Sequence, residues 1–349
     1  MNRLVFLLIG IIGIFIFFPA LAPAEEFESM GRFRFLDLFL SPRLHYQQSG
    51  PGGFELDESW IGFQWQRDER VKAIIKLGSS DLIRPLVWYA PTQDPRFQVV
   101  EAWMEGRSSV GDLRAGLLAV PQGFEGAFPE WNSVLPESAV RRRGWILQRD
   151  YGLQFRWDTQ PWATALSVHN GESGADKDRE LWFSGLWQYK DSDGWGLLLT
   201  ASTGHTSNDS TQGSVAASRE GFVFDSSADA KIRYAILSLF KEEGRSLFLL
   251  EAGRGDLIQQ ERTHPFLWGR ADVVWNFGGD ASLLLRYEQT SSDMTDSGTR
   301  ISTPGLGVVL ASADNLQSLT LYASRNDEPN RDPNYEFWLI FRLHSNLLK

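Results

Sequence analysis

Residues 267 to 277 read Leu-Trp-Gly-Arg-Ala-Asp-Val-Val-Trp-Asn-Phe, and their alternation decides the fold class. Every second position from 267 to 277 avoids charge, whereas Arg270, Asp272 and Asn276 fall on the opposite face. Successive side chains of a β-strand point to opposite sides, so this period of two predicts a strand. Similar segments recur to the end of the chain, with few helical stretches to cover them. An apolar outside, a polar inside and aromatic residues near the strand ends are typical of a transmembrane β-barrel.

The first 24 residues predict a secretory signal peptide. A short basic start, Met1-Asn2-Arg3, precedes an apolar run over residues 4–18, and Ala22-Pro23-Ala24 offers a small-x-small cleavage site. We therefore expect residues 1–24 to be cleaved and residues 25–349 to form a single barrel domain. An uncleaved anchor is the alternative, but the apolar run is shorter than the ~20 residues of a spanning helix.

Composition narrows the class of protein further. The formal net charge is −10, which argues against nucleic acid as a partner. The chain has no cysteine, so neither a disulfide framework nor a thiolate metal site can form. Its 14 Trp and 23 Phe suit the aromatic girdles that barrels place at both membrane interfaces. These features predict an exported protein of the bacterial outer membrane, with outer-membrane lipids as partners.

Alternating segments bounded by turn residues predict an all-β fold, an antiparallel barrel of about sixteen strands. The expected strands are 32–47, 55–66, 70–77, 97–107, 112–120, 148–157, 162–168, 181–190, 194–204, 231–241, 246–254, 266–277, 281–289, 300–311, 316–325 and 335–344. Residues 191–194, 241–245 and 278–280 predict tight turns, whereas 206–227, 256–264 and 291–298 predict longer polar loops. Short turns at one end and long loops at the other are the usual outer-membrane arrangement.

The two faces of each strand can be assigned from charge. In strand 281–289 the apolar positions oppose Arg286 and Glu288, which we expect to face inward. A charge facing lipid at the middle of the bilayer would cost about 2–4 kcal/mol. Strand 246–254 is less regular, because Leu247 and Leu249 share a face with Glu251. A filled lumen or a local bulge would each explain that pattern.

The long connection from Val120 to Leu147, between the fifth and sixth predicted strands, bears most on function. It begins Pro121-Gln-Gly-Phe-Glu-Gly and ends with the basic run Arg141-Arg-Arg-Gly. Irregular backbone at membrane depth is tolerated where it lines a water-filled cavity, so this aromatic and charged segment can fold inward and narrow the barrel. An ordinary extracellular loop with a solvated basic run is the alternative.

Charged residues in and near this segment predict a pore constriction. We expect some of the acidic members to face cations across the pore, and opposed charges in a narrow passage select ions. The predicted constriction residues are Glu125, Glu130, Glu137, Arg141, Arg142 and Arg143. The predicted lumen-lining cations are Arg114, Arg156, Arg270, Arg286 and Arg342. The cations expected to face the three glutamates are drawn from five arginines, Arg114, Arg141, Arg142, Arg143 and Arg156. Because these basic residues outnumber the acidic ones, we expect a mild anion preference.

Two segments resemble a known family. Residues 99–119, read with Pro121-Gln-Gly-Phe-Glu, are similar to the "edAyve … lrvGqfktPfglE" segment of the phosphate-selective porins of the O and P type. Arg149-Asp-Tyr-Gly-Leu-Gln resembles the "RdlGvql" strand of the same family. The resemblance implies a sixteen-stranded porin, usually a homotrimer, with its third extracellular loop folded into the lumen. It also implies a pore lined by arginines and lysines.

The function that we expect is a passive, water-filled channel for small hydrophilic solutes. A plugged or structural barrel is the main alternative, since Trp182, Leu186, Trp338 and Ile340 fall on inward faces. A barrel-embedded enzyme is a further alternative, but no histidine sits in a recognisable Ser/His or Asp/His sequence pattern. The histidines are His45, His169, His205, His264 and His344. We expect no catalytic residue, no metal site and no cofactor.

Overall fold

The computed structural model describes residues 31–48, 53–79, 97–128, 131, 134–142, 145–146, 149–171, 180–206, 229–312, 317–329 and 331–346. The expected signal peptide, residues 1–24, lies outside these ranges. Among the described residues, no helix is both long enough and apolar enough to cross a bilayer.

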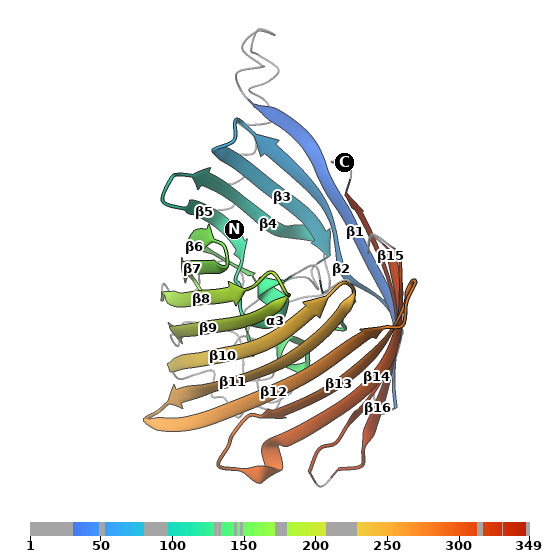
Figure 1. Cartoon of the computed structure of the whole chain (residues 1–349). Coiled ribbons are helices and arrows are strands. Elements are labelled where there is room, and N and C mark those ends of the chain that lie inside the picture. Colours follow the sequence, from blue (N-terminus) through green and yellow to red (C-terminus); the bar gives the residue numbers. More distant parts are fainter. Residues whose placement is uncertain are drawn as a thin grey trace.

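Sixteen antiparallel strands form one closed barrel (Figure 1). The strands are β1 (Arg32–Gln47), β2 (Gly53–Gln66), β3 (Val71–Ser79), β4 (Phe97–Arg107), β5 (Asp112–Ala119), β6 (Arg149–Thr159), β7 (Trp162–His169), β8 (Trp182–Lys190), β9 (Trp195–Thr206), β10 (Ala230–Glu243), β11 (Ser246–Gln259), β12 (Arg262–Asn276), β13 (Ala281–Ser291), β14 (Arg300–Ala311), β15 (Gln317–Asn326) and β16 (Asn334–Asn346). Each strand pairs with its neighbours in sequence, and β1 closes the ring against β16. Closure satisfies backbone hydrogen bonds without leaving an edge exposed to lipid.

The predicted strands agree with the structure, and one of the predicted connections needs correction. The predicted loop at 206–227 lies, from residue 207 on, outside the described residues. Residues 67–70, 108–111, 160–161, 191–194 and 277–280 are short links at one end of the barrel, which we name the turn end. The opposite end, named the loop end, carries the connection between β5 and β6 and that between β13 and β14. The predicted loop at 256–264 is wrong, because β11 and β12 continue through it and meet at Gln260 and Glu261. Both residues adopt a positive φ, 49° and 64°, without the glycine or asparagine that usually marks such a turn.

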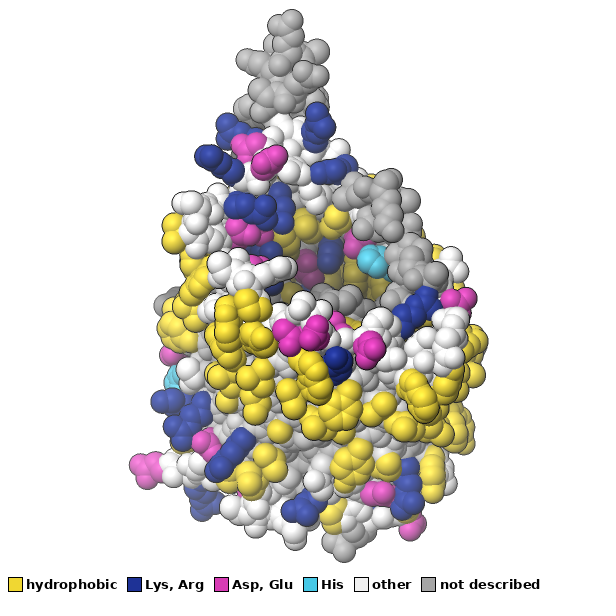
Figure 2. Space-filling view, viewed as in Figure 1, with side chains coloured by type: hydrophobic (Ala, Val, Ile, Leu, Met, Phe, Trp, Pro, Cys, Tyr) yellow, Lys and Arg dark blue, Asp and Glu magenta, His cyan; other side chains and the backbone are white. Residues whose placement is uncertain are grey.

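The outer wall of the barrel is apolar and the inner faces carry charge. Leu285 and Tyr287 of β13 are 43% and 48% exposed, whereas Arg286 and Glu288 between and beside them are buried inside. In Figure 2 hydrophobic side chains cover much of the outer wall, and charged side chains gather toward its borders. This arrangement is that of a wall in contact with lipid.

The irregular alternation of β11 has a simple explanation. Its register against β10 and β12 runs without a shift, so no bulge is present. Leu247, Leu249 and Glu251 all point inward and all are buried. The lumen is therefore filled at this position, and the filling comes from the connection between β5 and β6.

Candidate channel and its inner loop

The connection between β5 and β6, residues 120–148, folds into the barrel and is named the inner loop. It contains two short helices, α3 (Gly123–Ala127) and α4 (Ala139–Arg142). Figure 1 shows α3 inside the ring of strands, and α3 contacts β9 and β10. The inward-folding loop expected from the sequence is thus present.

The first turn of α3 is held by side chains of the wall. Backbone N–H groups at a helix start have no partner within the helix and need one elsewhere. The N–H of Gly123 donates to Thr200 Oγ1 at 3.2 Å, and that of Phe124 donates to Glu251 Oε2 at 2.6 Å. Gly123 has a φ of +64°, and a Cβ there would lie 3.1 Å from Glu251, so glycine suits both its backbone conformation and its close approach.

Glu125 lies at the centre of a buried ion cluster. Arg270 Nη1 of β12 is 2.8 Å from Glu125 Oε1, and Arg270 Nη2 is 3.2 Å from Glu251 Oε1. Ser138 donates both its N–H and its hydroxyl to Glu125, which ties the two halves of the loop together. Burial raises the pKa of Glu125, but attraction by Arg270, Arg141 and Arg286 outweighs burial and lowers the pKa to about 2. Glu125 is therefore a carboxylate at neutral pH.

The second half of the inner loop is bound to β13 and β16. Arg286 Nη1 donates to the carbonyl oxygen of Pro136 at 2.6 Å, and its Nε pairs with Asp272 at 2.7 Å. Arg342 Nη2 donates to the carbonyl oxygen of Leu135 at 3.2 Å. These arginines bind backbone carbonyls, which fixes the path of the loop against the wall.

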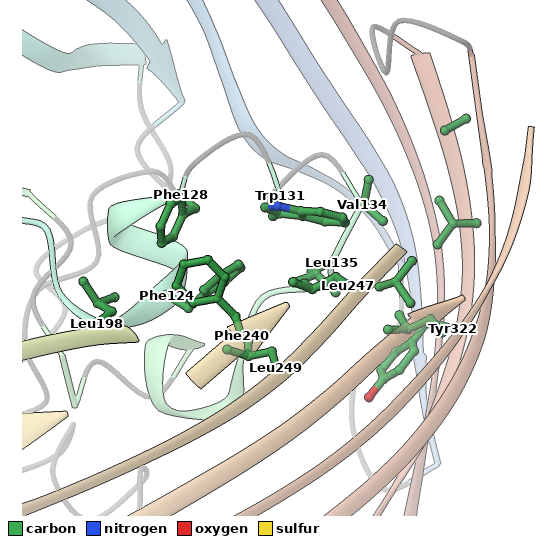
Figure 3. Packing of buried hydrophobic residues seen from close by; sticks show 14 of the residues in the cluster. Phe124, Phe128, Trp131, Val134, Leu135, Leu198, Phe240, Leu247, Leu249 and Tyr322 are labelled. Atoms are coloured by element: carbon green, nitrogen blue, oxygen red, sulfur yellow. The ribbon is translucent and has the colours of Figure 1, made fainter. Parts of the chain in front are cut away.

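Apolar side chains of the barrel wall also pack against the inner loop. Phe124, Phe128 and Phe240 form a group with ring centroids 4.8–5.2 Å apart. Figure 3 shows these rings beside Trp131 and Leu135 of the loop and the wall leucines of β9 and β11. We name this group, with Leu198, Leu247, Leu249 and Tyr322, the inner apolar cluster. It explains why β8–β16 carry apolar residues on inward faces: they form the seat of the loop.

The opposite side of the barrel carries a charged wall. We name as the N-terminal wall the inward side chains Lys72, Lys76, Glu101, Trp103, Glu105, Arg114 and Arg149 of β3–β6. Lys76 and Arg149 each lie 3.3 Å from Glu101, and Lys72 and Arg114 lie 2.9 and 2.7 Å from Glu105. Four cations thus share two carboxylates.

Exposure separates this wall from the seat of the loop. The side chains of Lys72 and Arg114 keep 29% and 25% of their surface exposed, whereas Arg270 and Arg286 keep 2% and 1%. Figure 2 shows the molecule hollowed in its upper part, with basic, acidic and hydrophobic side chains around the opening. Water therefore has access along the N-terminal wall, while the loop fills the side of β8–β16.

The structure places the predicted constriction residues in different surroundings. Glu125 pairs with Arg270 of β12, and Arg141 and Arg286 also attract its carboxylate, in a loop that lies against β9–β13. Glu137 lies four residues before Arg141, with 3.7 Å between Arg141 Nε and Glu137 Oε1. Glu130 and Arg143 lie outside the described residues, as does the side chain of Arg142.

The five predicted lumen arginines divide into two groups. Arg114 belongs to the N-terminal wall, and Arg156 lies near the turn end beside a carboxylate at 2.9 Å. Arg270, Arg286 and Arg342 hold the inner loop. Three inward arginines are therefore loop anchors.

Sequence reasoning missed Lys72, Lys76 and Arg149. In the structure Lys72 pairs in register with Glu105, and Lys76 with Glu101. Complementary charges at these facing positions favour this pairing of β3 with β4. Alternation alone, however, does not predict the register of two strands that are joined by the long connection of residues 80–96.

A second arrangement that sequence spacing did not reveal lies on β6, β7 and β8. His169 Nδ1 is 2.8 Å from Asp150 Oδ2, and its Nε2 is 2.7 Å from Ser184 Oγ. Asp150 also accepts the backbone N–H groups of Tyr151 and Gly171. This order of serine, histidine and aspartate is the one that activates a serine nucleophile.

The serine of this arrangement is enclosed by the inner loop. Ser184 Oγ lies 2.7 Å from Ser202 Oγ and accepts a hydrogen bond from Gln122 Nε2 at 3.3 Å. Tyr234 donates to the amide oxygen of the same Gln122. The network thus binds the start of the loop to three strands.

Together, the closed sixteen-stranded barrel, the apolar outer wall and the inner loop define the fold of the outer-membrane porins. No family model matches the chain, and no curated protein sequence matches it.

Several solved structures of similar fold are outer-membrane proteins. An anion-selective porin from Comamonas acidovorans has a TM-score of 0.63 at 11% identity, covering 90% of this chain and 100% of that one. The trimer form of OmpT from Vibrio cholerae has a TM-score of 0.63 at 11% identity, covering 90% of this chain and 99% of that one. OmpF of Salmonella typhi in complex with daunomycin has a TM-score of 0.60 at 11% identity, covering 91% of this chain and 98% of that one. The chain is a barrel of the bacterial outer membrane.

Proposed function

We propose that the chain is a passive, water-filled channel for small hydrophilic solutes. The observation that carries the proposal is the contrast between the two sides of the lumen. The inner loop is fixed against β8–β16 by buried ion pairs, whereas Lys72, Lys76 and Arg114 of the N-terminal wall opposite stay partly exposed. A fixed loop beside a hydrated charged wall is a passage of defined width.

We propose a mild anion preference for this channel. Lys72, Lys76, Arg114 and Arg149 outnumber Glu101 and Glu105, so the wall carries an excess of positive charge. Charged side chains lining a pore favour ions of the opposite sign. The anion-selective porin of similar fold supports this preference. Phosphate, implied by the resemblance of segments 99–119 and 149–154, is the first anion to test.

We also propose a homotrimer. The porin resemblance implies it, and the trimer form of OmpT from Vibrio cholerae supports it at the level of the fold. Chemical cross-linking of the protein in mild detergent tests this state, and a species of monomer mass at all concentrations would contradict it.

Selectivity tests the role of the N-terminal wall. Replacing Lys72 and Lys76 together by Gln should lower the anion-to-cation permeability ratio at least about twofold. Each lysine attracts a passing anion, and two unit charges 4 Å apart in water interact by about 1 kcal/mol. Arg114 and Arg149 still pair with the two glutamates, so the double variant should fold. Reversal potentials in a salt gradient measure the ratio. The outward Lys231→Gln is the control, and a double variant that matches wild type contradicts the assignment.

A second candidate function is acyl transfer, because Ser184, His169 and Asp150 have the geometry of a hydrolase. We favour a structural role, since Ser184 is only 8% exposed and its hydroxyl already bonds to Ser202. A fluorophosphonate probe distinguishes the two functions. We expect no labelling of the folded protein. Labelling that disappears in Ser184→Ala would establish an enzyme.

A further inference from the structure

The outer wall carries a groove of about 930 Å³ that the channel does not use. It crosses β5–β11 on the face that meets the membrane. Its sides are the exposed apolar residues of β5–β8, among them Leu153, Leu166 and Phe183. Arg233, Arg254 and Asp256 line the part of the groove on β10 and β11.

The floor of the groove is a row of small residues in register. Gly185 of β8 faces Ala201 of β9, and Ala201 faces Ala235 of β10. The next partner in the row, opposite Ala235, is Arg254 of β11. In this one row, three consecutive strands present only a hydrogen atom or a methyl group, and the row ends at a guanidinium.

The arginines lie near the border of the apolar band on the loop side. Lys241, at the other end of β10, lies over the Trp195 ring at 5.2 Å and marks the aromatic girdle near the turn end. Arg233 precedes Lys241 by eight residues in the same strand, roughly 26 Å along it. With a tilt of about 40° this is roughly 20 Å across the membrane, against an apolar band about 25 Å tall.

The positive charge at this border is only partly balanced. Arg233 Nη2 lies 2.8 Å from Asp256 Oδ2, and its side chain is still 57% exposed. Among the described residues, Arg254 and the outward Lys231 have no carboxylate partner. An unpaired cation at the apolar border favours an anion that lipid itself can supply, and guanidinium groups bind phosphate through paired hydrogen bonds.

We propose that this groove binds a phosphate-bearing lipid of the leaflet on the loop side. An acyl chain lies on the floor of Gly185, Ala201 and Ala235. The phosphate lies between Arg233 and Arg254. The apolar floor excludes a free hydrophilic anion, and the excess positive charge disfavours a purely apolar occupant.

Native mass spectrometry of the purified protein in detergent tests the site, with diphosphoryl lipid A and the same lipid after dephosphorylation as probes. Wild type should bind the phosphorylated probe more strongly. Replacing Arg233 and Arg254 together by Gln should weaken that binding about tenfold, since charge-assisted hydrogen bonds are lost. Ala201→Trp fills the floor and should weaken binding of both probes. All of these positions face outward, so the barrel core is unchanged.

Matched controls come from β15. Arg325, which pairs with Asp327 at 2.6 Å, and Ala323 both face outward there, so Arg325→Gln and Ala323→Trp should bind both probes like wild type. Equal binding of the two probes by wild type, or unchanged binding in the double arginine variant, overturns the proposal. So does a result in which Ala201→Trp breaks an oligomer and leaves lipid binding unchanged, because a second copy then occupies the groove.

Discussion

Replacing Arg270 by Met is expected to lower the free energy of unfolding by about 3–5 kcal/mol, the range for breaking a buried ion pair by removing one partner. Arg270 is the cation between Glu125 of the loop and Glu251 and Asp272 of the wall, all buried. Without it these carboxylates face one another in a poorly hydrated interior. The loop should therefore leave its seat, and the single-channel conductance should rise and become noisy.

Chemical unfolding in lipid vesicles and planar-bilayer recordings measure the two effects. The control is Arg325→Met, which removes an exposed ion pair with Asp327 and should cost about 1 kcal/mol or less. Equal losses for the two variants, or a steady wild-type conductance in Arg270→Met, would contradict the anchoring role of Arg270.

Replacing Phe124 by Ala should have an effect of similar size, about 3–5 kcal/mol, the range for deleting a buried aromatic side chain. Phe124 and Phe240 are fully buried, with ring centroids 5.2 Å apart. The cavity would form in the inner apolar cluster, where the loop and the wall meet, so the loop should also become mobile.

The matched control for this variant is Phe341→Ala. Phe341 faces outward and is 43% exposed, so lipid chains can fill the space that its ring leaves. Unfolding in vesicles should show a smaller loss for Phe341→Ala, with conductance unchanged. A loss at Phe341 as large as that at Phe124 would mean that the inner apolar cluster contributes little to stability.

The barrel could be predicted from the sequence because its signal is local. Lipid on one side and polar groups on the other impose alternation on every strand, and β1, β4 and β14 have the same bounds in prediction and structure. The turn at Gln260 and Glu261 was missed because its backbone conformation is imposed by the pairing of β11 with β12 and not by glycine or asparagine.

The partners inside the barrel could not be predicted in the same way. The segment 120–147 was expected to fold inward from its aromatic and charged content, but the pairing of Glu125 with Arg270 joins residues 145 positions apart. Such a pair depends on which strands of the barrel wall the inner loop contacts. The same holds for Ser184, which meets His169 only through the registers of β7 and β8.

Single-channel recording of the purified protein in planar bilayers tests the central claim most directly. A fixed inner loop beside a hydrated, positively charged wall predicts uniform conductance steps that carry more anion than cation. A protein that inserts as a folded barrel, shown by heat-modifiable migration on gels, yet gives no conductance steps would contradict this account.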